Sequence, residues 1–353
     1  MEEEFPLETL TELQNHADEV WYLEFSHDGS MLATAGKDGL VCVYNTQTWR
    51  LQAEFREHDR NIAGSENNRG VNYVAFSPDA QHLISCSGNN EFVVVNVREA
   101  RRVAMADHFD YPVTAAAWLP DSQTFVVGTQ SYRRPLGLYS LRSSAGSSSS
   151  SSSVVRNNEI HSFRDPPWDP SLKDNPQSFR ITDCAVSSDG TRLVATTTSN
   201  RIMMYDLNTR LKIAEWAMED KLTSINFGVP LAPSTISDHE DDPFADVPPD
   251  TQLLVNMNSG HVLALSATTG EVLQRYAGAR QAEYVIRSRF GGAGQNFVIS
   301  GSEDSRVWIW RRQTGARVAV LEAHAPGTVN AVAWHPTDGA VWASAGDDRR
   351  VRM

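Results

Sequence analysis

Near the end of the chain, three residues have the side chains that hydrolases use for nucleophilic catalysis. They occur in the order His324, Ser344 and Asp348. A histidine that is oriented by an aspartate can take the proton of a serine, and the activated serine then attacks a carbonyl carbon. These residue types raise the question of whether the chain carries one catalytic centre or a structural pattern.

The same residue types recur along the chain, which favours a structural role. His16, Thr34 and Asp38 stand in the same order near the start. A nucleophile needs one activated copy, whereas repeated copies are typical of buried polar networks that satisfy their own hydrogen bonds. We therefore predict no catalytic residue and no enzyme activity. The predicted network residues are His16, Thr34, Asp38, Ser300, Asp304, Trp310, His324, Ser344 and Asp348.

Short alternating segments surround these residues and predict an all-β protein. Runs such as "GVNYVAFSPD" and "VNAVAWHPTDG" alternate apolar and polar residues and end in Gly, Asp or Pro turns. We place the residue that closes the third strand of successive units at Tyr44, Val95, Tyr139, Tyr205, Leu265 and Trp310. The shortest intervals, 44 residues from 95 to 139 and 45 residues from 265 to 310, match the period of a WD-repeat blade. The chain thus resembles a seven-bladed WD-repeat β-propeller.

The ends of the chain are predicted to complete one ring. A seventh unit starts at His324 and stops at Met353, before its outer strand. Residues 5–13, "FPLETLTEL", precede the first histidine and are predicted to supply that strand. Closure by an N-terminal strand removes exposed sheet edges. We therefore predict one propeller domain over residues 1–353.

Two insertions interrupt this domain. Residues 143–153 are Ser-rich and predict a flexible tether. Residues 237–250, "SDHEDDPFADVPPD", contain six acids and no Lys or Arg. This acidic loop is predicted to be solvated, or to dock on a basic partner.

Composition and motifs exclude several functions. A net charge of −13 argues against nucleic-acid or anionic-membrane binding over the whole surface. No signal peptide and no apolar stretch of ~18 residues is present, and three scattered cysteines indicate reduced thiols. These features predict a cytoplasmic or nuclear protein. No metal-binding or cofactor motif is found, since "FGGAGQN" (290–296) lacks the Lys-Ser/Thr of a phosphate loop.

Three longer strings are similar to one family. "HADEVWYLEFSHDGSMLATAGKDG" (16–39), "YVIRSRFGGAGQNFVISGSEDSRVWIWRR" (284–312) and "VLEAHAPGTVNAVAWHP" (320–336) resemble the WD-repeat subunit of the GID/CTLH ubiquitin ligase. The resemblance implies a scaffold or substrate-recruiting subunit that promotes proteasomal degradation, with ligase subunits and substrates as protein partners. Family members usually carry N-terminal LisH and CTLH helices. The first unit here begins by His16, so we expect either a fragment or a different assembly.

Protein partners are expected to bind one face of the propeller. Loops between second and third strands and loops between blades share a face, which we call the top face. The predicted partner-binding residues there are Trp21, Lys37, Tyr73, Tyr284, Arg287, Glu303, Asn330 and Asp347. Aromatic and Arg side chains often dominate interface energies. The alternative for Trp21, Tyr73 and Tyr284 is packing between blades.

Two other functions remain open from the sequence. One is a WD-repeat adaptor of another complex, for instance one that binds histone tails or links a signalling complex. The other is a propeller hydrolase, which requires clustered carboxylates or metal ligands in the channel that the sequence does not show. The oligomeric state stays open.

Overall fold

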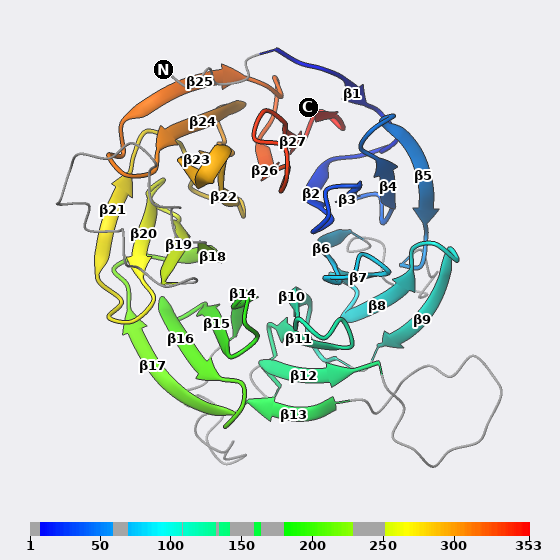
Figure 1. Ribbon diagram of the computed structural model, residues 1–353, viewed down its shortest axis with the longest axis vertical. Coiled ribbons are helices and arrows are strands. Elements are labelled where there is room, and N and C mark those ends of the chain that lie inside the picture. Colours follow the sequence, from blue (N-terminus) through cyan, green and yellow to red (C-terminus); the bar gives the residue numbers. More distant parts are fainter. Residues whose placement is uncertain are drawn as a thin grey trace.

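Seven antiparallel sheets of four strands stand radially around a central channel (Figure 1). The computed structural model describes residues 8–58, 70–107, 109–131, 134–141, 159–163, 180–228 and 251–353. Within these ranges the only helical element is the short 3-10 turn η1 (Ala293–Gln295). The predicted seven-bladed propeller is therefore confirmed. Both predicted insertions, 143–153 and 237–250, lie outside the described residues.

Each blade takes four strands that pair in order from the channel outwards. Blade 1 contains β2 (Val20–Phe25), β3 (Met31–Gly36), β4 (Val41–Asn45) and β5 (Arg50–Phe55), and blade 2 contains β6 (Val71–Phe76), β7 (His82–Ser87), β8 (Glu91–Asn96) and β9 (Arg101–Ala106). Blade 3 contains β10 (Val113–Trp118), β11 (Thr124–Thr129), β12 (Leu136–Ser140) and β13 (Glu159–Phe163), and blade 4 contains β14 (Ile181–Val186), β15 (Arg192–Thr197), β16 (Arg201–Asp206) and β17 (Leu211–Ala217).

The remaining three blades complete the ring. Blade 5 contains β18 (Leu222–Gly228), β19 (Gln252–Met257), β20 (Val262–Ser266) and β21 (Val272–Tyr276), and blade 6 contains β22 (Ser288–Gly291), β23 (Phe297–Ser300), β24 (Arg306–Arg311) and β25 (Arg317–Glu322). Blade 7 contains β26 (Val329–Trp334), β27 (Trp342–Gly346), β28 (Val351–Arg352) and β1 (Glu12–Leu13).

The N-terminal strand closes the ring as the outer strand of blade 7. Glu12 pairs with Arg352, and Leu13 pairs with Val351. The backbone N–H of Leu10 also donates to the carbonyl of Met353 at 2.6 Å. The closing strand predicted over 5–13 is thus the two-residue β1, and residues 1–7 lie outside the described chain.

Side chains from neighbouring blades form the core between the sheets. The six third-strand residues placed from the sequence period are all buried, and each occupies the second-to-last position of its strand. Tyr139 of blade 3 contacts Phe92 of blade 2 with ring centroids 5.2 Å apart. Phe163 of blade 3 lies 5.1 Å from Tyr205 of blade 4. Burial of such rings between sheets is a main stabilising contribution in layered β folds.

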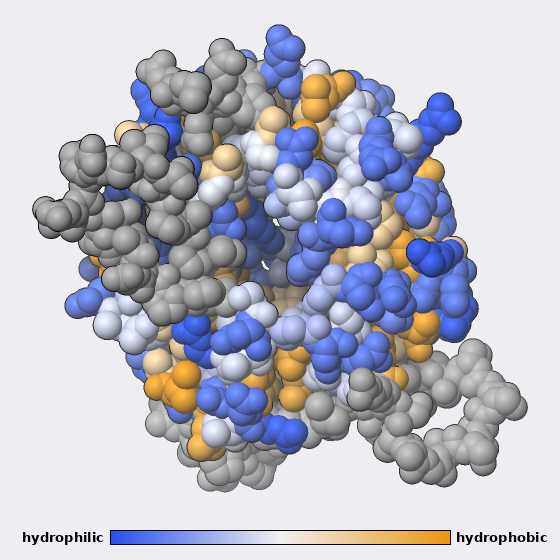
Figure 2. All heavy atoms as spheres, in the orientation of Figure 1, coloured by the Kyte–Doolittle hydropathy of each residue, from blue (hydrophilic) through white to orange (hydrophobic). Residues whose placement is uncertain are grey.

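The centre of the ring is hollow on the face that Figure 2 shows, and hydrophilic residues border much of the hollow. The inner strands β2, β6, β10, β14, β18, β22 and β26 surround it (Figure 1). Loops that enter these inner strands lie on the top face. The channel mouth on that face is where one strand from each blade can contribute side chains to a common site.

Candidate functional site

The three residues that suggested a hydrolase form a buried hydrogen-bonded chain. His324 Nδ1 lies 2.7 Å from Asp348 Oδ1, and His324 Nε2 lies 2.8 Å from Ser344 Oγ. In blade 1, His16 Nε2 lies 2.8 Å from Thr34 Oγ1, and its Nδ1 lies 3.1 Å from Asp38. We call each such set a histidine network.

A third histidine network, in blade 2, was missed from the sequence. His58 Nδ1 lies 2.8 Å from Glu91 Oε1, and His58 Nε2 lies 2.7 Å from Ser85 Oγ. In blades 1 and 7 the acid stands four residues after the hydroxyl, ahead of the third strand. Glu91 instead opens β8. A single Glu at the start of a largely apolar strand is the sequence signal that would have revealed it.

Burial of the hydroxyls makes the histidine networks structural. Ser344 and Thr34 both have 0% exposure, so a substrate carbonyl has no route to either oxygen. Burial alone would raise the pKa of Asp348, but hydrogen bonds and positive charge from His324 and Arg352 outweigh it and lower that pKa to about 2. Arg352 also pairs with Glu12 at 3.1 Å, so this network reaches the closing strand β1.

In blade 6, the predicted network residues do not form one connected chain. Ser300 Oγ donates to the adjacent carbonyl of Gly301 at 2.9 Å. Asp304 accepts from Trp308 Nε1 at 3.4 Å, whereas Trp310 Nε1 donates to the carbonyl of Ala277 at 3.1 Å. Blade 6 thus contains the serine, the aspartate and the tryptophan, but no histidine in the described residues connects Ser300 to Asp304.

A pocket of about 310 Å³ opens at the channel mouth. It is lined by Glu19, Trp21, Asn72, Thr114, Gln130, Thr182, Tyr284, Val285, Arg287, Asn330 and Asp347. These residues come from six of the seven blades, and only blade 5 contributes none. A concave site with apolar walls and a few polar groups is the usual form of a binding pocket.

A repeated β-bulge brings one residue from each of five blades to this pocket. In six blades the pairing between the first two strands shifts register near the start of the first strand. The extra residues in these blades are Trp21, Asn72, Thr114, Thr182, Thr223 and Asn330. A bulge leaves one residue unpaired and redirects its side chain. All of them except Thr223 line the pocket.

The structure divides the eight predicted partner-binding residues. Five of them line the pocket, namely Trp21, Tyr284, Arg287, Asn330 and Asp347. Lys37 lies beside the pocket and pairs with Glu19 at 2.8 Å. Tyr73 is buried below the mouth, where its ring lies 4.4 Å from that of Tyr22. Tyr73 therefore packs between blades 1 and 2, which is the alternative that the sequence left open.

The eighth residue, Glu303, shapes a loop. Its Oε1 accepts the backbone N–H groups of Ala282, Glu283 and Tyr284 at 2.9, 2.8 and 3.0 Å. Burial would raise the pKa of Glu303, but these hydrogen bonds outweigh it and lower the pKa. The loop holds Tyr284 and Val285 at the mouth, with 54% and 48% exposure.

Below the pocket lies a buried cluster of charged and aromatic residues. The guanidinium of Arg287 stands 4.7 Å from the Tyr22 ring and 5.2 Å from the Tyr73 ring. Arg289 donates to the Tyr22 hydroxyl at 2.7 Å. Burial raises the pKa of Glu24 to about 7, although the nearby charge of Arg289 opposes that shift. The cluster joins blades 1, 2 and 6 across the axis.

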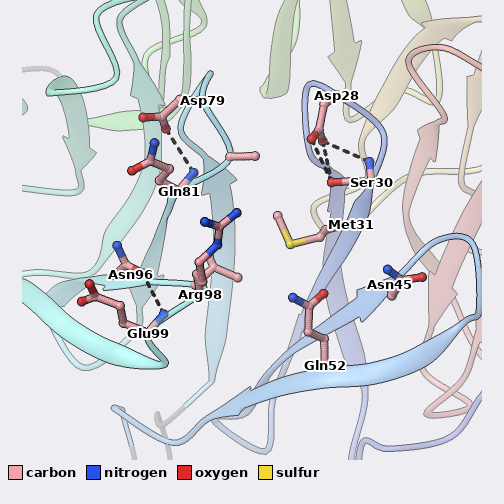
Figure 3. Close-up of a pocket in the computed structure, with 12 residues that line it drawn as sticks. Asp28, Ser30, Met31, Asn45, Gln52, Asp79, Gln81, Asn96, Arg98 and Glu99 are labelled. Atoms are coloured by element: carbon pink, nitrogen blue, oxygen red, sulfur yellow. Dashed lines mark hydrogen bonds between the residues drawn. The ribbon is translucent and has the colours of Figure 1, made fainter.

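A second cavity, of about 460 Å³, lies between blades 1 and 2 on the opposite face. Figure 3 shows its turn residues facing one another across the gap. The carboxylates in it serve their own turns, because Ser26 Oγ donates to Asp28 and Ser77 Oγ donates to Asp79, both at 2.6 Å. These two carboxylates therefore stabilise the turns that carry them.

Neither metal chemistry nor a membrane helix has structural support in the described part of the chain. No group of three His, Cys, Asp or Glu side chains there is arranged to hold a metal ion. No helix among the described residues is long and apolar enough to cross a membrane.

Comparison with known proteins agrees with this architecture. The family model "WD domain, G-beta repeat" matches residues 7–45, 51–94 and 315–353. The β-propeller domain of Cps50 (Swd1) from Myceliophteria thermophila superimposes with a TM-score of 0.70 at 17% identity and covers 98% of both chains. The structural likeness shows the β-propeller fold, and the WD-repeat model matches three segments of it.

Proteins of similar sequence indicate which WD-repeat proteins the chain resembles. The chain is 28% identical to a "WD repeat-containing protein WDS homolog" and 27% identical to a "WD repeat-containing protein 26 homolog", both from Arabidopsis thaliana, over 99% of its length. It is 26% identical to "GID complex subunit 7" of Schizosaccharomyces pombe, again over 99% of its length. The chain spans 51% to 59% of the length of these relatives. Its homologues therefore include a WD-repeat subunit of the GID complex.

Proposed function

We propose that this chain is a non-catalytic scaffold and substrate-recruiting subunit of a GID/CTLH-type ubiquitin ligase. In this role it promotes ubiquitin-dependent proteasomal degradation in the cytoplasm, the nucleus or both. The observation that carries the proposal is the similarity to GID complex subunit 7, which extends over 99% of the chain.

The geometry supports binding at the channel mouth. Tyr284 and Val285 are held in solvent beside a pocket, on a loop that one carboxylate organises. The other large exposed apolar side chains among the described residues are Leu10, Leu51, Leu211, Ile213, Val272 and Leu273, on outer strands or near the N-terminus. Exposed apolar residues at a concave site are typical of protein contacts.

Affinity purification tests this function. The tagged full chain, expressed in cells that contain the ligase, should co-purify ligase subunits, identified by mass spectrometry. Tyr284→Ala should lower recovery of a mouth-bound partner about tenfold, because an exposed aromatic anchor is lost. Leu211→Ser is the control, because Leu211 is also exposed but lies on the outer strand β17, and it should not change the recovery.

Absence of every ligase subunit from a folded, soluble bait would overturn the proposal. The alternative is an adaptor of another complex, such as one that binds histone tails or links a signalling complex. Recovery of such a complex in place of ligase subunits would favour this alternative.

A further inference from the structure

One carboxylate at the channel mouth, that of Asp347, forms no direct ion pair within the described part of the chain. Asp347 Oδ2 accepts the backbone N–H of Thr328, and its Oδ1 accepts Asn330 Nδ2, both at 2.8 Å. Among the described residues Asp347 forms no ion pair, although it lines the pocket and remains half-buried. The neutral donors fix the direction of the carboxylate, and Lys37, whose charge acts on it, is already paired with Glu19 and Asp18.

The surrounding surface charge is also acidic. Lys37 pairs with Glu19 at 2.8 Å and with Asp18 at 3.9 Å, and the charge of Asp347 also acts on it, so one positive charge faces three carboxylates. Glu283, on the loop that carries Tyr284, is exposed. The pocket therefore attracts a positive group, and unlike charge strengthens both the rate and the selectivity of association.

Aromatic rings complete a site for a cation. The ring of Tyr284 is half exposed at the pocket edge, and Trp21 lines the same pocket with its indole N–H donated to Glu19 at 2.9 Å. Ring faces attract ammonium and guanidinium groups, and the alkyl stem of Lys or Arg packs well on apolar surface. A carboxylate beside such rings suits a basic side chain better than a purely apolar one.

The floor of the pocket limits how far a cation can enter. Arg287 is 5% exposed, and its guanidinium is stacked on two tyrosine rings with its Nε 4.0 Å from Asp183 Oδ2. This buried positive charge repels a second cation below the mouth. A basic group therefore rests at the level of Asp347, and the channel beneath does not accept it.

We propose that the channel mouth docks an extended segment of a partner protein by accepting one of its arginine or lysine side chains. The cation lies beside Asp347, and its alkyl stem packs against Tyr284. This inference rests on the proposed function, because it names the chemistry of the partner that the same site recruits.

Fluorescence anisotropy with the full chain tests the proposal. The probes are fluorescein-labelled peptides of sequence Gly-Ser-Ala-X-Ala-Ser-Gly, in which X is arginine, lysine, citrulline or glutamate. Citrulline keeps the shape of arginine without its charge. At about 50 mM salt, where screening is moderate, the arginine and lysine peptides should bind saturably and the citrulline peptide about tenfold more weakly.

Two variants, each of which replaces one aspartate by asparagine, show where the peptide binds. Asp347→Asn should weaken the arginine peptide about fivefold, whereas Asp338→Asn should change binding less than about twofold. Asp338 is an exposed aspartate of the same blade on the opposite face, where it accepts the N–H of Ala340 at 2.9 Å. Thermal unfolding of both variants verifies that they are folded.

Several results would overturn the inference. These are absence of saturable binding by both basic peptides, equal binding of arginine and citrulline peptides, tighter binding of the glutamate peptide, or equal effects of the two variants. The proposed function fails separately, through the co-purification experiment. If ligase subunits co-purify but the basic peptides do not bind, only this inference is wrong. If the basic peptides bind but no ligase subunit co-purifies, only the proposed function is wrong.

Discussion

Blades 7, 1 and 2 differ from blades 3 to 6 in how their polar interiors are satisfied. Each of the first three holds a buried histidine between a hydroxyl and an acid. Within the described part of blades 3 to 6, no such histidine is hydrogen-bonded in that way. The family model matches residues 7–45, 51–94 and 315–353, which include these three networks. The difference shows that a blade can form without the signature by which the sequence is recognised.

In blades 3 to 6, other contacts take the place of the histidine networks. In blade 3, the rings of Phe125 and Tyr139 stack at 5.8 Å. In blade 5, Ser224 Oγ donates to Asn256 Oδ1 at 3.0 Å. Packing between blades and paired strands therefore set the architecture, and the histidine networks add stability to part of it.

The channel mouth uses both groups of blades. Asp347 and Trp21 come from blades with histidine networks, whereas Tyr284 lies on the loop that enters blade 6. A site that spans the two groups depends on the whole ring being closed. Three predictions address this comparison, and the largest effect is expected in the histidine networks.

Replacing His324 by Ala should lower the free energy of unfolding by about 3 kcal/mol. The change leaves Asp348 without its histidine partner and Ser344 without a hydrogen bond from the ring, in a buried position. Urea unfolding measures the difference. Ser300→Ala, at the position of blade 6 that corresponds to Ser344, should cost less than about 1 kcal/mol, because that hydroxyl bonds only to the adjacent carbonyl. Equal losses for the two variants would show that the histidine network contributes no more to stability than the isolated hydroxyl of blade 6.

Acid should remove a smaller part of the stability of blade 7. The folded pKa of Asp348 is about 2, below its ordinary value of 3.8. Because the folded state holds this carboxylate ionised, the contribution is fully present above pH 4 and is lost as the pH falls towards 2. The stability difference between the natural chain and Asp348→Asn should therefore shrink by about 2 kcal/mol over that window. A constant difference measured by chemical unfolding at pH 5 and pH 2 would contradict the proposed linkage.

The smallest effect on stability is expected at Glu303, although its loop should change clearly. Glu303→Ala removes the acceptor of three backbone N–H groups, so exchange of the 282–284 amides should rise about tenfold while global stability falls by about 1 kcal/mol or less. Glu303→Gln keeps a carbonyl acceptor and should retain most of the protection. Hydrogen–deuterium exchange measures both variants. If the Gln variant exchanges as fast as the Ala variant, charge and not acceptor geometry holds the loop.

Much of the fold could be predicted because it depends on short-range pattern. Period-two runs and the spacing of third-strand residues gave the blades, even where Leu265 replaced an aromatic residue. The acid of blade 2 was missed, because Glu91 reaches His58 from the strand and not from the turn. Pattern spacing identifies a residue type at a position, but it does not say which of two nearby side chains turns inwards.

The mouth residues show a similar limit. Successive first strands carry the pairs Val20-Trp21, Val71-Asn72, Val113-Thr114, Ile181-Thr182, Leu222-Thr223 and Val329-Asn330. The second residue of each pair is the bulged one, yet only Trp21 and Asn330 were predicted as partner-binding residues. A bulge is a feature of pairing between two strands, so one strand alone does not reveal it.

The sequence by itself determined the seven alternating units and the polar residues that recur in them, because strand period and turn chemistry are local properties. Only the tertiary structure decided which of those residues meet. Closure of the ring brought Glu12 to Arg352 and placed Asp347 beside Tyr284 at one pocket. Contacts between residues so distant in the chain follow from how the blades are placed around the axis, which no local pattern encodes.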